Sequence, residues 1–205
     1  MRLAVILARK GSKRLPGKNT KKLVNKSLIE YTIEEALKSQ MFDCIIVSTN
    51  DPEVMGVVFS RWKEDGHIYV IGRPEYLCNA SAPSEEAVLY TIEKAELMTY
   101  VEYDLVCLLQ PTSPLRTAED ITEAVLLSEA IEGGVWSVNE ETDKVNGAIY
   151  YDSVERLREL RKFTDLEPYP MPAARSVDID TEADFIAAEG YIKTKEWEND
   201  DTEKV

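Results

Sequence analysis

Residues 3–19 read LAVILARKGSKRLPGKN, an apolar run followed at once by a basic loop that contains two glycines. We expect the run from Leu3 to Ala8 to form a buried β-strand, because six residues are too few for a signal-peptide core or a membrane span. In open α/β sheets, ligands bind beyond the carboxyl ends of the strands. The loop after this strand is therefore the first candidate for a binding site.

The rest of the chain alternates apolar runs with helical patterns, which is typical of βαβ units around a mostly parallel sheet. Further strands are expected at 44–48, 67–71, 105–109, 135–138 and 148–151, with helices starting near Ser27, Pro52, Ser84, Thr117, Ser153 and Thr181. We find no internal repeat and no linker. The sequence predicts a single-domain α/β fold over residues 1–195, with helices flanking the sheet, and a frayed acidic tail at 196–205.

Composition narrows the classes of function. The chain has 205 residues, 44% of them hydrophobic, which suits one domain with a full core. Its net charge of −14 argues against nucleic acid or an anionic membrane as partner. Its single histidine excludes a multi-histidine metal site. Three widely spaced cysteines, Cys44, Cys78 and Cys107, indicate free thiols in a reducing compartment, so we expect a cytoplasmic protein.

The loop after the first strand is basic although the chain as a whole is acidic: the segment from Arg9 to Lys26 holds eight basic residues and no acidic one. Gly11 and Gly17 allow backbone N–H groups to approach an anion without a Cβ in the way. Neither GxxxxGK[ST] nor GxGxxG is present, so this is not a P-loop or a dinucleotide fingerprint. The basic side chains favour a polyphosphate-binding loop over a surface turn; they include Arg9, Lys13, Arg14 and Lys18.

The string ARKGSKRLPGKN at 8–19 resembles the first signature of the acylneuraminate (CMP-sialic acid) cytidylyltransferases, ARxGSKxLPGKN. The resemblance continues at 42–49, at 73–84, in LLQPTSPLR at 108–116, in NGAIY at 146–150 and in RSVDIDTE at 175–182. It implies a Rossmann-like fold of the nucleotide-diphospho-sugar transferase type, similar to GT-A enzymes. It also implies transfer of CMP from CTP to the anomeric hydroxyl of an acidic 2-keto sugar, sialic acid or a related nonulosonate, with release of pyrophosphate.

The resemblance assigns roles to individual positions. Arg9 and Lys18 are predicted to contact the triphosphate and to act in catalysis. The nucleotide-binding set is Leu7, Ala8, Arg9, Gly11, Ser12, Lys18, Asn19, Arg73 and Ser84. Gln110 and Tyr150 are predicted on the sugar side. Plainer roles remain open for three of these residues: an N-cap for Ser84, a turn residue before Pro111 for Gln110, and a core aromatic for Tyr150.

Asp178 and Asp180 are separated by one apolar residue, so an extended segment would turn both carboxylates the same way, with Cα atoms about 6.5–7 Å apart. Two carboxylates beside phosphates can share a Mg²⁺ ion. Alone, the pair fits a solvated strand end before an N-cap at Thr181 nearly as well. Within RSVDIDTE the metal interpretation is favoured, so Asp178 and Asp180 are predicted as catalytic Mg²⁺ ligands. A water on this metal is our hypothesis for the group that deprotonates the sugar hydroxyl.

One segment departs from the family. Only residues 139–145 separate Val138 from Asn146, where family members carry a longer excursion that forms much of the sugar pocket and an arm to the partner subunit. A homodimer is therefore left open, with a shortened arm.

Three alternatives also remain. The first is a cytidylyltransferase for another acid sugar such as 3-deoxy-manno-octulosonate, although an aspartate would then be expected in place of Gln110. The second is a glycosyltransferase that uses DxD to hold a metal, and the third is a catalytically silent nucleotide-binding relative.

Overall fold

The computed structural model describes residues 1–79 and 81–202, with side chains as far as Thr194. Its strands are β1 (Arg2–Leu7), β2 (Lys22–Leu23), β3 (Lys26–Ser27), β4 (Cys44–Thr49), β5 (Ile68–Gly72), β6 (Leu105–Leu109), β7 (Val135–Asn139), β8 (Val145–Ser153) and β9 (Glu167–Met171). Its α-helices are α1 (Leu28–Ser39), α2 (Pro52–Trp62), α3 (Ser84–Thr99), α4 (Ala118–Ile131), α5 (Val154–Leu160) and α6 (Glu182–Thr202). Short 3₁₀ turns lie at Glu75–Leu77 and Ala173–Arg175.

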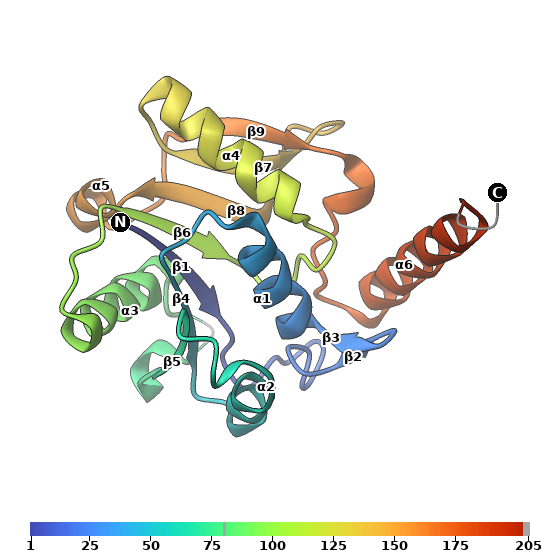
Figure 1. Cartoon of the computed structure of the whole chain (residues 1–205), viewed down its shortest axis with the longest axis horizontal. Coiled ribbons are helices and arrows are strands. Elements are labelled where there is room, and N and C mark those ends of the chain that lie inside the picture. Colours follow the sequence, from blue (N-terminus) through green and yellow to red (C-terminus); the bar gives the residue numbers. More distant parts are fainter. Residues whose placement is uncertain (80, 203–205) are drawn as a thin grey trace.

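The main sheet has seven strands in the order β5-β4-β1-β6-β8-β7-β9 (Figure 1). β1 lies inside the sheet and pairs in parallel with β4 and β6, and β4 pairs in parallel with β5. Only β8 runs against its neighbours β6 and β7. The predicted mostly parallel sheet is confirmed. Because β1, β4, β5 and β6 run the same way, the loops that leave them gather at one edge.

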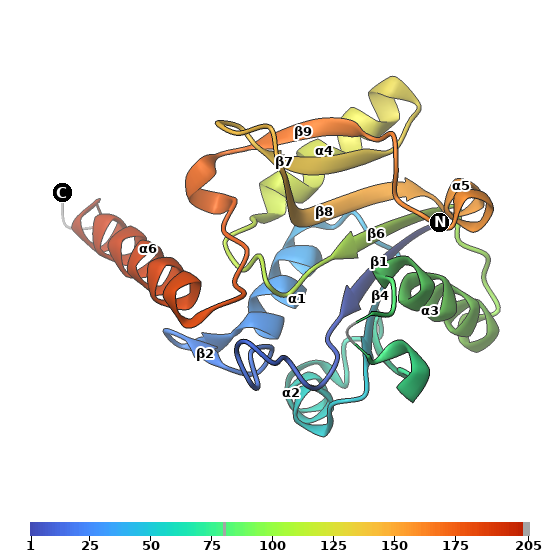
Figure 2. The ribbon, with the colours of Figure 1, turned by 180° about the vertical axis from the view of Figure 1, so that it is seen from behind.

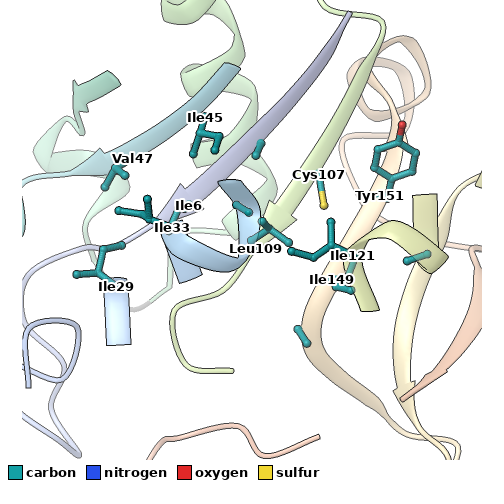
Figure 3. Packing of buried hydrophobic residues seen from close by; sticks show 14 of the residues in the cluster. Ile6, Ile29, Ile33, Ile45, Val47, Cys107, Leu109, Ile121, Ile149 and Tyr151 are labelled. Atoms are coloured by element: carbon teal, nitrogen blue, oxygen red, sulfur yellow. The ribbon is translucent and has the colours of Figure 1, made fainter. Parts of the chain in front are cut away.

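Helices cover both faces of the sheet. One face is buried under α1, α2 and α4, and the other under α3 and α5 (Figure 2). Figure 3 shows how side chains of four strands meet those of α1 and α4 on the face that α1, α2 and α4 cover, including Ile6, Val47, Leu109, Ile149, Ile33 and Ile121. Burial on both faces explains why the central strands read as unbroken apolar runs.

A smaller apolar cluster supports the basic loop. Leu15 from the loop packs with Leu23 of β2, Leu28 of α1, Ile179 and Phe185 of α6. Segments distant in sequence are thereby held together beneath the loop. From this contact α6 projects away from the sheet (Figures 1 and 2).

Helix starts follow the predicted signals. Ser27 and Thr117 form capping boxes, and the carboxylate of Asp51 accepts a hydrogen bond from Glu53 N–H ahead of Pro52 at the first helical position. Thr181 and Asp184 exchange hydrogen bonds at the start of α6. Each signal is local in sequence, and each prediction here is confirmed.

The sequence analysis did not predict β2, β3 or β9. β9 contains Pro168 and Pro170, which argue against a strand because proline lacks an N–H group. β9 is an edge strand, however, and pairs in parallel with β7 alone. Its hydrogen bonds use the alternate residues: Glu167 N–H donates to Gly134 O, and Met171 O accepts from Glu140 N–H. Pro168 and Pro170 occupy the positions between these residues, where an N–H group would point away from β7, so the ladder loses no donor by their presence.

All three cysteines are free and buried, as expected from their spacing. Among the described residues, no helix is long and apolar enough to cross a membrane. The backbone of α6 continues to Thr202, which includes the first part of the predicted tail. Fraying from residue 196 stays a prediction, because the side chains from 195 onward and residues 203–205 lie outside the described structure.

Candidate functional site

A cavity of about 510 Å³ opens at the edge where the parallel strands end. Its wall comes from the basic loop after β1, the loop between β5 and α3, and the loop after β6, together with Asp180. The lining residues are Leu7, Arg9, Ser12, Lys13, Arg14, Lys18, Asn19, Arg73, Asn79, Ala82, Ser84, Gln110, Pro111, Thr112 and Asp180. The topology therefore brings together residues that are up to 173 positions apart in sequence, as Leu7 and Asp180 show.

The basic loop has a defined conformation. The side-chain amide of Asn19 donates to Arg9 O at 3.2 Å and closes the loop across its base, while Leu15 anchors its middle. Gly11 and Gly17 have φ of +91° and +66°, in the left-handed region that favours glycine. A Cβ at either position would meet nothing within 4 Å, so this backbone is open on the side that a side chain would occupy.

Two guanidinium groups of the cavity have no carboxylate partner among the described residues. Arg73 is 7% exposed, its Nε makes no hydrogen bond, and burial lowers its pKa. The positive charge of Arg9 lowers the pKa of Arg73 further, against an opposing effect from Cys78. Arg9 itself donates to Cys78 O at 3.1 Å. Two such cations close together are costly unless an anion joins them.

Asp180 is the acidic member of the cavity lining. Lys18 Nζ donates to Asp180 Oδ1 at 3.0 Å and to Ile179 O at 3.1 Å, and Arg14 Nη2 donates to Asp180 Oδ2. Both carboxylate oxygens of Asp180 are therefore bound to cations of the basic loop. These contacts join the start of the chain to the RSVDIDTE segment.

Asp178 lies beside the cavity lining rather than in it, and its residue is exposed. The protein atoms that surround its carboxyl nevertheless desolvate it and raise its pKa. The charge of Asp180 acts in the same direction, while the Thr112 hydroxyl and Lys18 oppose the rise. Residues 177–180 are not part of a strand. The expected extended geometry of the two aspartates is therefore not built from a sheet.

Thr112 joins this segment to the loop after β6. Its carbonyl accepts from Ile179 N–H at 2.7 Å, and its hydroxyl lies 3.5 Å from Gln110 Oε1. Gln110 packs against Gly147 of β8, where φ of +79° requires glycine. The sequence analysis missed Thr112, although it stands within the motif LLQPTSPLR.

The segment between β7 and β8 is as short as the sequence indicates. The strands β7 and β8 are joined by a tight turn in which Asn139 N–H donates to Lys144 O at 2.9 Å. Tyr150 of β8 packs against Phe163, with ring centroids 5.5 Å apart, and is not part of the cavity lining. Its sugar contact stays a prediction.

Ser84 is the first residue of α3, whose N-cap is Pro83, so the N-cap alternative for Ser84 is wrong. The start of α3 thus faces the cavity, where the helix dipole favours negative charge. Of the remaining predicted residues, Ala8 and Gly11 lie in the loop but outside the lining. Asn79 and Ala82 line the cavity without having been predicted, because the resemblance in this loop rests on Arg73, Pro74, Glu75 and Ser84 and not on the residues between them.

Comparison with known proteins identifies the family. A family model described as cytidylyltransferase matches residues 3–179. The chain belongs to the cytidylyltransferases. A curated relative, the CMP-N,N'-diacetyllegionaminic acid synthase of Legionella pneumophila, is 38% identical over 167 residues, which are 82% of this chain and 70% of the relative. The predicted family and its nucleotidyltransferase class are thereby confirmed.

Other relatives match this cytidylyltransferase over a smaller share of their length. The N-acylneuraminate cytidylyltransferase of Escherichia coli O18:K1:H7 is 42% identical over 130 residues, 63% of this chain and 29% of the relative. That of Streptococcus agalactiae serotype III is 30% identical over 228 residues, 93% of this chain and 53% of the relative. The second alignment exceeds the 205 residues of this chain, so the streptococcal protein has extra residues within it.

Solved structures confirm the predicted fold type. CMP:2-keto-3-deoxy-manno-octonic acid synthetase complexed with CTP superposes with a TM-score of 0.64 at 18% identity, over 95% of this chain and 99% of that one. The 4-diphosphocytidyl-2C-methyl-D-erythritol synthase of Anaerococcus prevotii gives 0.67 at 15% identity, over 94% and 96%. At such identities the likeness concerns the fold alone.

Proposed function

We propose that this cytidylyltransferase transfers CMP from CTP to the anomeric hydroxyl of an acidic 2-keto sugar, sialic acid or a related nonulosonate. The observation that carries the proposal is the pair Arg9 and Arg73, two cations without a carboxylate partner in a cavity beyond the carboxyl ends of parallel strands. Such a cavity suits an anion with several charges. The named relatives, which join CMP to nonulosonates, support the substrate class.

In the proposed reaction, the sugar oxygen forms a bond to the α-phosphorus of CTP, and the bond to the β-phosphate oxygen breaks. The sugar hydroxyl gives its proton to water, and pyrophosphate leaves. Arg9 and Lys18 bind the β- and γ-phosphates and stabilise the negative charge of the leaving pyrophosphate. Asn19 and Ser84 orient the nucleotide. Gln110, at the end of β6, offers an amide to the sugar.

Mg²⁺ belongs to the proposal as well. Among the described residues, no group of three or more acidic, histidine or cysteine side chains gathers at one point. Asp180 in the cavity lining and Asp178 beside it supply two carboxylates, which fits a Mg²⁺ ion that would be completed by substrate phosphates and water. When bound, the ion would neutralise charge on the phosphates. The two aspartates would hold it, with Thr112 keeping their segment against the loop after β6.

The proposal also covers cellular location and oligomeric state. A cytoplasmic location is supported by three free, buried cysteines. Homodimer formation is left to experiment, because the turn between β7 and β8 replaces the arm expected from the family.

The test is a mass-spectrometric search for CMP-sugars after incubation with CTP, Mg²⁺ and one acid at a time: N-acetylneuraminic, legionaminic, pseudaminic or 3-deoxy-manno-octulosonic acid. We expect one nonulosonate product, lost on chelation and lost in Arg9→Gln. Lys10→Gln is the matched control, because Lys10 is exposed on the same loop outside the cavity lining. A product from the octulosonate alone would favour the alternative sugar. CTP binding without any product would favour a silent relative.

A further inference from the structure

Asp180 has no free oxygen in this structure. Arg14 Nη2 holds Oδ2, and Lys18 Nζ holds Oδ1 at 3.0 Å. A divalent cation cannot bind the same carboxylate strongly while two positive charges already lie against it, because the three cations repel one another. One of the two contacts must open before Asp180 can serve as a ligand.

The two cations differ in how firmly they are placed. The Lys18 side chain is 15% exposed and has a second acceptor in Ile179 O, so it is held on two sides. The Arg14 side chain is 67% exposed, and its contact with Asp180 is its one ion pair among the described residues. Arg14 also lines the cavity, so its guanidinium reaches the nucleotide space without a change in the fold. Arg14 is therefore the contact that opens more easily.

We propose that Arg14 shields Asp180 from a divalent cation until a polyphosphate draws the guanidinium away, so that nucleotide and cation binding favour each other. This inference rests on the proposed function, in which Asp180 holds Mg²⁺ beside a triphosphate. A triphosphate carries more negative charge than one carboxylate and offers the paired oxygens that a guanidinium prefers. Because binding couplings are reciprocal, a cation on Asp180 would in turn release Arg14 toward the phosphates.

The test measures Mn²⁺ binding without nucleotide, by electron paramagnetic resonance of the free ion. Arg14→Gln removes the shield, and we expect its Mn²⁺ dissociation constant to fall about 1.5- to 5-fold below that of the unaltered chain, the range for an exposed ion pair. Lys13→Gln is the matched control. It removes the same charge from the same cavity, but Lys13 has no ion pair with Asp180.

A double-mutant cycle with Asp180→Asn makes the result specific. We expect Arg14→Gln to have no effect on Mn²⁺ binding once Asp180 is replaced. Equal Mn²⁺ affinity in the unaltered chain and Arg14→Gln, including no binding in either, overturns the proposal. So does an equal gain in Arg14→Gln and Lys13→Gln, which would be a general charge effect. Failure of the proposed function shows separately, as the absence of any CMP-sugar.

Discussion

The ion pair between Arg175 and Asp120 fixes the segment that carries Asp178 and Asp180. Asp120 on α4 is 0% exposed and accepts from Arg175 Nε at 3.0 Å and Nη2 at 2.7 Å. Thr117 adds two hydrogen bonds to the same carboxyl. Burial opposes ionisation of Asp120, but the hydrogen bonds from Arg175 and Thr117 outweigh it and lower the pKa of Asp120.

Replacing Arg175 with alanine leaves this carboxylate buried without its cation. Breaking a fully buried pair costs about 3–5 kcal/mol, and we expect the lower end, about 3 kcal/mol, because Arg175 is 28% exposed and the Thr117 bonds remain. At about 2–4 °C per kcal/mol for a domain of this size, the melting temperature should fall by about 6–12 °C. Urea unfolding followed by tryptophan fluorescence gives the free energy of unfolding directly.

The matched control is Arg158→Ala, because Arg158 pairs with Glu96 at the surface and is 50% exposed. An exposed pair of this kind contributes less than about 1 kcal/mol. If Arg175→Ala costs no more than Arg158→Ala, the Asp120 pair is not what holds this segment, and the reasoning fails. If Asp120→Asn added to Arg175→Ala recovers part of the loss, the cost lies in the unpaired charge.

Three further predictions follow from named contacts. Ionised Asp120 stabilises the fold above the ordinary carboxyl pKa, and this stabilisation is lost as the pH falls through the lowered pKa of Asp120. The difference in free energy of unfolding between the unaltered chain and Asp120→Asn should therefore become smaller below about pH 4, as measured by urea titrations from pH 7 to 3. Arg73→Met should weaken CTP binding at least about tenfold by calorimetry without lowering the melting temperature, because it removes a buried cation that has no carboxylate partner; a large drop in melting temperature would contradict this. Thr112→Val removes the hydroxyl that lies 3.5 Å from Gln110 Oε1, so it should raise KM for the sugar acid about 3-fold or more, the scale of one lost hydrogen bond, and Thr112→Ser should restore it. Ser113→Ala is the control, since the Ser113 hydroxyl is buried without a partner; an equal effect in both variants would refute the positioning of Gln110 by the Thr112 hydroxyl.

Local signals carried most of the sequence-based prediction. The apolar run of β1 placed the basic loop, and the capping residues Ser27, Asp51 and Thr117 placed three helix starts. These features depend on neighbours within a few positions, which a sequence displays directly. Motif resemblance extended the prediction to distant positions such as Gln110 and Asp180, which the fold brings into one cavity.

The remaining features depend on contacts between distant segments. The bond from Arg14 to Asp180 spans 166 positions, and buried Arg73 lies near Arg9, which is 64 positions earlier in the chain. The strand β9 forms because β7 offers it a partner, despite two prolines that locally disfavour it. In none of these three cases does the local sequence indicate which distant segment is the partner.

The prolines of β9 also determine how the sheet can grow. An exposed strand edge is a template on which another chain can pair. In β9 the residues whose N–H groups would point outward include Pro168 and Pro170, so that edge lacks these donors. A second molecule therefore cannot continue the sheet regularly past β9. Within the seven-stranded sheet, regular strand addition is left to the opposite border, at β5, and the β9 border is protected against unwanted aggregation.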